Sequence, residues 1–154
     1  MNSPGAVVVD ANILISICSK EPTCANAEQA LAGYASRNWL FYAPGVIVAE
    51  VLYVLCRKRE DVLLTEAAHD QAIKIFEDHM TVILPPPHGD ASLINRANEI
   101  RSSYGCSHSA DGLYIALTEE LAQKGAAEFL TFDKSSVNQA GKNAAAVRVN
   151  LLAT

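Results

Sequence analysis

Patterns of cysteine and histidine that would bind zinc are missing from this sequence of 154 residues. The cysteines form no CxxC pair, and no histidine stands beside them at the spacing of a zinc finger. Scattered cysteines of this kind are typical of buried, reduced thiols in a reducing compartment. The four cysteines are Cys18, Cys24, Cys56 and Cys106.

The histidines also lack the spacing of metal ligands. We expect none of them to be catalytic, although His108 is set apart by its position three residues before Asp111. The four histidines are His69, His79, His88 and His108.

A hydrophobic run long enough to cross a membrane is missing as well. The richest apolar stretch, residues 46–55, is too short for a bilayer and carries Glu50 in its middle. No basic segment precedes the short apolar run at residues 6–9, so we expect no signal peptide. The sequence therefore predicts a cytoplasmic protein without a membrane partner.

Positive charge is scarce, because 12 lysines and arginines face 17 acidic residues and the net charge is −5. This balance argues against a protein that holds nucleic acid by bulk electrostatics. It leaves room for a nuclease, because a cluster of acids accounts for much of the deficit and a bound metal would offset it locally. Half of the residues are hydrophobic and 19% are charged, which together with the length predicts one globular domain over residues 1–154.

Short apolar runs alternate with longer helical patterns along the chain, which predicts an α/β fold with a mainly parallel sheet covered on both faces. Strands are predicted at 6–9, 40–43, 82–84, 129–132 and 147–149. Helices are predicted at 28–34, from Pro44 to 59, at 65–80, from an Asp90 cap to 100, and from Ser109 to about 125.

Two acids directly follow predicted strands: Asp10 comes after residues 6–9, and Asp133 comes after residues 129–132. Binding sites in parallel sheets form beyond the carboxyl ends of the strands, so both acids are expected at the functional edge. Each of them taken singly also fits an ordinary turn, where aspartate is frequent.

Two further acids lie on predicted helices. Glu50 is flanked by Val46 and Val54, so we expect it to be poorly solvated and to need a compensating partner. Asp111 stands in the first turn of its helix, where the helix dipole favours its ionised form. An outward-facing glutamate and an ordinary helix-start acid are the structural alternatives, and the convergence of all four acids on one side argues against them.

Four carboxylates gathered in one pocket would repel one another, and hard divalent cations with oxygen ligands relieve that repulsion. Mg²⁺ or Mn²⁺ suits such a site, whereas the lack of a histidine or cysteine cluster disfavours zinc. The chemistry that follows most directly is hydrolysis of a phosphodiester, in which a metal-bound water attacks and charge on the leaving oxygen is stabilised.

Four segments of this sequence resemble the PIN-domain family, and their order, spacing and total length are most similar to VapC-type toxins of toxin–antitoxin pairs. The resemblance covers nearly the whole chain, and its specificity comes from having all four acids in order. The segments are residues 7–12 (VVVDAN), Glu50, residues 109–117 (SADGLYIAL) and residues 130–133 (LTFD).

This resemblance implies a PIN-like three-layer sandwich and an endoribonuclease that depends on Mg²⁺ or Mn²⁺. It implies an RNA substrate, an antitoxin partner that blocks the site, and a homodimer. The implied metal ligands and catalytic residues are Asp10, Glu50, Asp111 and Asp133, supported by Asn12, Ser109 and Thr131. Two departures stand out: Gly112 replaces the alanine usual after the third acid, and residues 20–40 match no family feature.

An acidic nuclease must still meet RNA phosphates, and a few cations are candidates for this contact. Lys134 follows Asp133 directly, and Arg57, Lys58 and Arg59 form a basic run. For the run, cations that complement a helix C-terminus are an equally good explanation.

Rival enzymes lack a required group. A phosphotransfer enzyme of the haloacid-dehalogenase type needs a second aspartate two residues after the first, where this chain has Asn12. A response-regulator receiver needs a phosphoacceptor aspartate after a middle strand, but prolines follow Leu84.

Two alternatives within the same fold stay open. One is a PIN nuclease of RNA processing outside any toxin pair, which a small antitoxin-like reading frame just upstream would argue against. The other is a non-catalytic PIN-like interaction module, against which the four acids count because a scaffold has no reason to keep mutually repelling charges.

Overall fold

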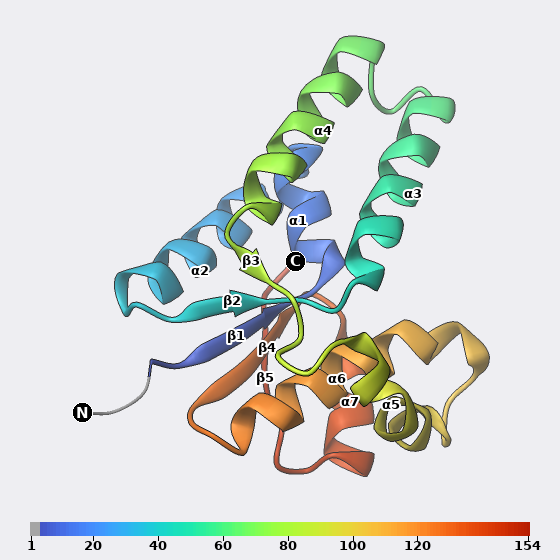
Figure 1. Ribbon diagram of the computed structural model, residues 1–154. Helices are drawn as coiled ribbons and strands as arrows, with labels where there is room; N and C mark the ends of the chain where they lie inside the picture. Colours follow the sequence, from blue (N-terminus) through green and yellow to red (C-terminus); the bar gives the residue numbers. More distant parts are fainter. Residues whose placement is uncertain (1–3) are drawn as a thin grey trace.

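The computed structural model describes residues 4–154 and has three layers, with a central sheet between two layers of helices (Figure 1). The strands are β1 (Ala6–Val9), β2 (Leu40–Tyr42), β3 (Ile83–Leu84), β4 (Ala127–Thr131) and β5 (Arg148–Leu151). The helices are α1 (Ala11–Cys18), α2 (Cys24–Ser36), α3 (Val46–Glu60), α4 (Glu66–Met80), α5 (Ile94–Arg101), α6 (Ser109–Ala122) and α7 (Lys134–Asn143).

The sheet has the strand order β3-β2-β1-β4-β5, and all four pairings are parallel. At the centre, Val8 of β1 is paired with Tyr42 on one side and Phe129 on the other. Strands β2 and β3 lie on one side of β1, and β4 and β5 lie on the other, so the strand order reverses between β1 and β4. In parallel sheets, ligands typically bind at the carboxyl ends of the strands where such a reversal occurs.

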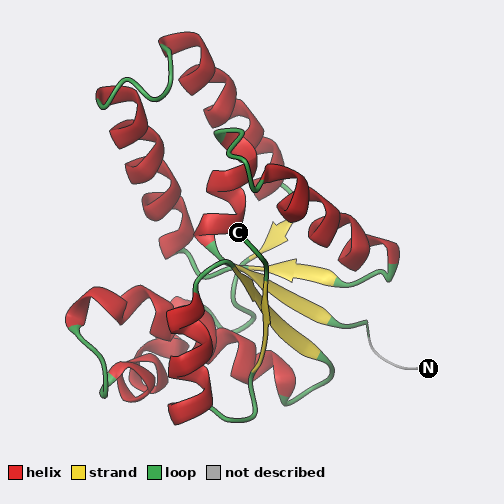
Figure 2. Cartoon of the chain, turned by 180° about the vertical axis from the view of Figure 1, so that it is seen from behind, coloured by secondary structure: helices red, strands yellow, loops and turns green. Residues whose placement is uncertain are grey.

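Helices α1 to α4 cover one face of the sheet and α5 to α7 cover the other (Figures 1 and 2). Every residue of β1 is buried, as expected for a strand covered on both faces. Helices α3 and α4 form an antiparallel pair that extends away from the sheet. The predicted α/β class, the mainly parallel sheet and the three-layer arrangement are confirmed.

Two helices were not predicted from the sequence, and both begin next to a candidate acid. Helix α1 starts directly after Asp10 and is buried nearly all round, so it shows no polar face by which its period could be recognised. Helix α7 starts directly after Asp133 and is mostly polar. Helix α2 is longer than predicted, starting at Cys24 rather than Glu28.

The predicted role of Asp90 was wrong. It does not cap its own helix but is the first residue of a short 3₁₀ turn that precedes α5. Its Oδ1 instead accepts a hydrogen bond, 2.8 Å long, from the backbone N–H of Gly45, the residue that precedes α3. The cap predicted at Thr65 is present, because its side chain accepts from the N–H of Ala68 at 3.0 Å.

Gly112 lets α5 and α6 approach each other closely. A Cβ atom at this position would lie 2.6 Å from the carbonyl oxygen of Ala97, a backbone atom in α5. The glycine is therefore required by the local packing of the two helices, which explains the departure from the usual alanine.

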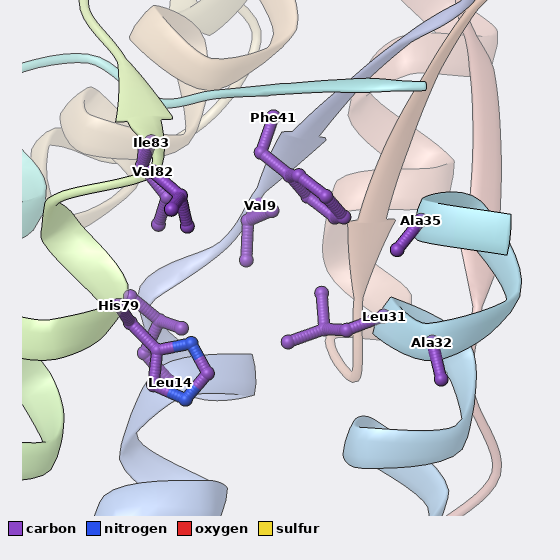
Figure 3. A pocket seen from close by; sticks show the side chains of 9 residues that line it. All are labelled: Val9, Leu14, Leu31, Ala32, Ala35, Phe41, His79, Val82 and Ile83. Atoms are coloured by element: carbon purple, nitrogen blue, oxygen red, sulfur yellow. The ribbon is translucent and has the colours of Figure 1, made fainter. Parts of the chain in front are cut away.

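An apolar cavity of about 230 Å³ lies on the face covered by α1, α2 and α4 (Figure 3). Val9 of β1, Leu14 of α1 and Leu31 of α2 line it, and His79 of α4 is the single lining residue that carries a side-chain nitrogen. None of the four candidate acids lines this cavity.

The cysteines are all free thiols, but the prediction that they are buried holds only for Cys18. Cys24 is partly buried, and Cys56 and Cys106 are exposed. Over residues 4–154, no helix combines the length and the apolar character that crossing a membrane requires.

Candidate active site

Asp10 lies at the carboxyl end of β1 and is only 6% exposed. Its Oδ2 accepts a short hydrogen bond, 2.6 Å, from the hydroxyl of Thr131 at the end of β4. Burial raises the pKa of Asp10 to about 7, and the negative charges of Asp111 and Glu50 also raise it, while the bond from Thr131 lowers it. The carboxyl ends of β1 and β4 therefore hold a buried carboxylate whose negative charge is poorly compensated.

Thr131 joins the ends of β1 and β4 through a small network. Its hydroxyl oxygen accepts from the side-chain amide of Asn12 at 3.1 Å and from the backbone N–H of Asp133 at 3.0 Å. Asn12 in turn accepts from the N–H of Phe132 at 3.3 Å. With both lone pairs used, the Thr131 hydroxyl is oriented so that its hydrogen is directed at Asp10.

Glu50 is partly buried, and its flanking residues Val46 and Val54 are partly buried against the core, as expected from the sequence. The outer face of α3 is nevertheless open to solvent, because Val48, Leu52 and Tyr53 are 41%, 43% and 66% exposed. The carboxylate of Glu50 contacts α6, where the hydroxyl of Tyr114 donates a hydrogen bond to Oε1 at 2.7 Å. Burial is the main cause that raises the pKa of Glu50.

Asp111 is held by two side chains on one of its oxygens. Nδ1 of His108 lies 3.1 Å from Oδ2, and the amide of buried Gln139 in α7 donates to the same atom at 3.2 Å. Burial raises the pKa of Asp111, as does the charge of Asp133, whereas His108 and Gln139 lower it. Sequence reasoning missed Gln139 and set His108 aside, although a histidine one helical turn before Asp111 was a usable signal.

Asp133 caps α7. Its Oδ1 accepts from the N–H of Ser135 at 2.8 Å, and its Oδ2 accepts from the Ser135 hydroxyl at 2.8 Å. Both oxygens are therefore engaged by the helix that the residue begins. Ser109, predicted as a supporting residue, donates its hydroxyl to the carbonyl of Cys106 at 2.6 Å and is exposed.

The four acids come from β1, α3, α6 and the β4–α7 junction. The charge of Asp111 acts on both Asp10 and Glu50, and the charge of Asp133 acts on Asp111. Asp111 therefore interacts electrostatically with each of the other three acids.

A family model described as the PIN domain matches residues 7–142. The chain belongs to the PIN-domain family. The resemblance inferred from the sequence is confirmed, and PIN domains are in general nucleases that use divalent metals.

Among solved structures, this PIN domain is similar to a chain of VapBC2 from Rickettsia felis, crystallised with a DNA fragment from the promoter. The TM-score is 0.64 with 13% sequence identity, and the likeness covers 96% of this chain and 99% of that chain. At this identity, the likeness shows the fold. No curated protein matches the sequence.

The donor set of this PIN domain fits a hard divalent cation in its chemistry. Its carboxylates supply only oxygen ligands. The pKa of Asp10 is raised first by burial and then by the negative charges of Asp111 and Glu50, and a cation would offset both effects. Within residues 4–154, however, no three acidic, histidine or cysteine side chains stand together as a ready metal site. Each carboxylate is instead bonded to a donor from the protein.

The candidate phosphate contacts differ in their surroundings. Lys134 is exposed at the start of α7, beside Asp133. The basic run lies in the last turn of α3, where its members contact neighbouring acids and Lys58 is bonded to both Glu21 and Ser19. The ion pairs of the run are Arg57 with Glu60 and Asp61, Lys58 with Glu21, and Arg59 with Glu66.

Proposed function

We propose that this PIN domain is a metal-dependent endoribonuclease that acts in the cytoplasm as the toxin of a type II toxin–antitoxin pair. The observation that carries the proposal is the environment of Asp10. A buried carboxylate whose pKa is raised to about 7, partly by two other acids, stands where strand order reverses and parallel sheets bind ligands. A site of this kind favours a cation and, through it, a phosphate.

Mg²⁺ or Mn²⁺ would be held by Asp10, Glu50, Asp111 and Asp133. When bound, such a cation lowers the pKa of a coordinated water and stabilises charge on the leaving oxygen of a phosphodiester. Asp133 contributes least to this set, because Ser135 already occupies both of its oxygens.

The protein itself orients these acids before any ligand arrives. Thr131 fixes one oxygen of Asp10, and His108 together with Gln139 fixes one oxygen of Asp111. In each case the second oxygen accepts no side-chain hydrogen bond from residues 4–154, although a backbone bond from Ala11 also reaches the Asp10 carboxylate. Preorganised ligands of this kind spare the reorganisation that metal and substrate binding would otherwise require.

Lys134 is the cation best placed to contact RNA phosphate, because it is exposed and directly follows Asp133. The basic run at the end of α3 is a weaker candidate, since its members are engaged with acidic neighbours. A phosphate contact at Lys134 would position the RNA without reading its sequence.

An antitoxin partner is supported by the solved neighbour, which is part of a VapBC complex. A nuclease of RNA processing outside a toxin pair and a non-catalytic module remain the alternatives, and a homodimer is also a prediction. Controlled expression followed by sequencing of RNA 5′ ends distinguishes a toxin from these alternative functions. A toxin gives growth arrest with new RNA ends that co-expression of the upstream reading frame suppresses, whereas a module gives neither.

The direct test is cleavage of RNA by the purified protein with Mg²⁺, with Mn²⁺ and with excess EDTA. We expect cleavage only with metal, and none from Asp111→Asn, whose folded state should be retained by circular dichroism. Asp61→Asn serves as the control, because this half-exposed acid at the end of α3 is remote from β1 and β4. Undiminished cleavage in EDTA, or by Asp111→Asn, rejects the proposal.

A further inference from the structure

Tyr114 is a fully buried residue of α6, one turn after Asp111, and its exposed fraction is 0%. Its ring stacks on Phe129 of β4, with ring centroids 5.6 Å apart and an angle of 22° between the planes. Its hydroxyl donates to Oε1 of Glu50 at 2.7 Å. The ring is therefore fixed by the core, while the polar end meets an acid of the candidate site.

This hydrogen bond joins the two helical layers. Glu50 belongs to α3 on one side of the sheet, whereas Tyr114 belongs to α6 on the other. A glutamate side chain has three rotatable bonds, so an unrestrained Glu50 would sample many positions. A donor anchored in the opposite layer selects one of them and leaves Oε2 without a hydrogen bond from the described residues.

We propose that Tyr114 is a positioning residue that holds Oε1 of Glu50 so that Oε2 faces the divalent cation. The inference rests on the proposed metal-dependent function and assigns a role to a residue outside the acidic quartet. Tyr114 touches neither the metal nor the RNA, and it acts through Glu50. Donors that orient metal ligands typically contribute about 10-fold to 100-fold in metal affinity.

The chain contains a matched control. Tyr34 of α2 is also buried, at 1% exposure, and its hydroxyl donates to Oε1 of Glu128 at 2.9 Å. Glu128 lies near the start of β4, at the sheet edge opposite to Asp133, and the hydroxyl of Tyr34 also accepts from Asn150 at 2.9 Å. A phenylalanine at either position removes one buried phenol–carboxylate bond, but only one of the two bonds involves the site.

The test measures binding of Mn²⁺ to the full-length protein without RNA, by electron paramagnetic resonance of the free ion. We expect Tyr114→Phe to weaken binding at least about 10-fold and Tyr34→Phe to leave it unchanged. Thermal unfolding without metal should show a loss of stability in both variants. Cleavage by Tyr114→Phe should require more Mg²⁺ and return towards the parental rate at saturating Mg²⁺.

A double-mutant cycle separates positioning from a general loss of structure. In a Glu50→Gln background, Tyr114→Phe should cause little further loss of Mn²⁺ affinity. If the parent binds Mn²⁺ and Tyr114→Phe binds it equally well, the positioning role is rejected while the proposed function stands. If the parent binds no Mn²⁺, the metal-dependent function and the positioning role are both rejected.

Discussion

The hydroxyl of Thr131 donates to Oδ2 of Asp10 across 2.6 Å, although 121 residues separate the two in the chain. The replacement Thr131→Val keeps the shape of the side chain and removes this donor. We expect affinity for Mn²⁺ to fall about 10-fold, because Asp10 loses the bond that orients it. Stability should fall by about 1–3 kcal/mol, since buried groups that bonded to the hydroxyl lose their partner.

Thr131→Ser is the matched variant, because it retains the hydroxyl. Titration of Mn²⁺ and chemical denaturation check both effects, and serine should restore most of the lost affinity. Equal affinity for valine and serine variants would show that the hydroxyl has no part in the site.

The raised pKa of Asp10 predicts how the stability of the metal-free protein depends on pH. Between the usual value of 3.8 and about 7, the folded protein keeps a proton on Asp10 that the unfolded chain has lost. Stability should therefore fall as pH rises through this window, by at most on the order of 4 kcal/mol, and this loss should be complete above it.

Denaturant unfolding of the metal-free protein at pH 4.5 and pH 8 measures this slope. Asp10→Asn should reduce this slope, leaving the part that comes from the raised pKa values of Glu50 and Asp111, and should stabilise the protein at pH 8. Asp61→Asn, at an exposed helix end, should leave the slope unchanged. Added Mg²⁺ should raise the melting temperature of the parent more at pH 8 than at pH 5, because ionised carboxylates bind the cation. A slope in Asp10→Asn as steep as that of the parent would assign the pH dependence to other groups.

The close approach of α5 and α6 predicts opposite outcomes for two helical glycines. Gly112→Ala should destabilise the protein by about 1–3 kcal/mol, because the new methyl group would meet the backbone carbonyl of Ala97. Gly33→Ala in α2 has open space and should stabilise by up to about 1 kcal/mol through helix propensity. Thermal unfolding of the two variants measures both effects. An unchanged stability of Gly112→Ala would mean that α5 can move away from α6 at little cost in free energy.

Lys134 is the first residue of α7, Lys124 lies two residues after the end of α6, and both are exposed. Lys134→Gln should weaken RNA cleavage several-fold at low salt and less at high salt, because the lost contact is with phosphate. Lys124→Gln, beyond the far end of α6 from Asp111, should have little effect. Cleavage rates at two ionic strengths test this, and equal effects of the two substitutions would remove Lys134 from the site.

The parallel sheet and the strand-end acids could be predicted because their signals are local. An apolar, β-branched strand that ends at an acid identifies both the strand and the residue at its carboxyl end, as for β1 and Asp10. Helix α1 escaped detection because it is buried nearly all round, and α7 because its sequence is mostly polar.

The bonds that orient the acids could not be predicted from the sequence alone. Tyr114 meets Glu50, and Gln139 meets Asp111, only because helices from separate parts of the chain pack together. A contact between side chains that are far apart in the sequence produces no periodic pattern in a single sequence. The partial burial of Glu50 could be predicted from Val46 and Val54, but the exposure of the apolar outer face of α3 could not.

Asp10 directly follows β1, and Asp133 lies two residues beyond the end of β4, the neighbouring strand. Paired strands are held about 4.8 Å apart by their backbone hydrogen bonds. The spacing of the two strands that lead to these acids is therefore set by the main chain, and it cannot widen unless backbone hydrogen bonds between β1 and β4 break. Substitution of side chains can therefore change the charge at the ends of β1 and β4, whereas the separation of the two strands is fixed by their backbone pairing.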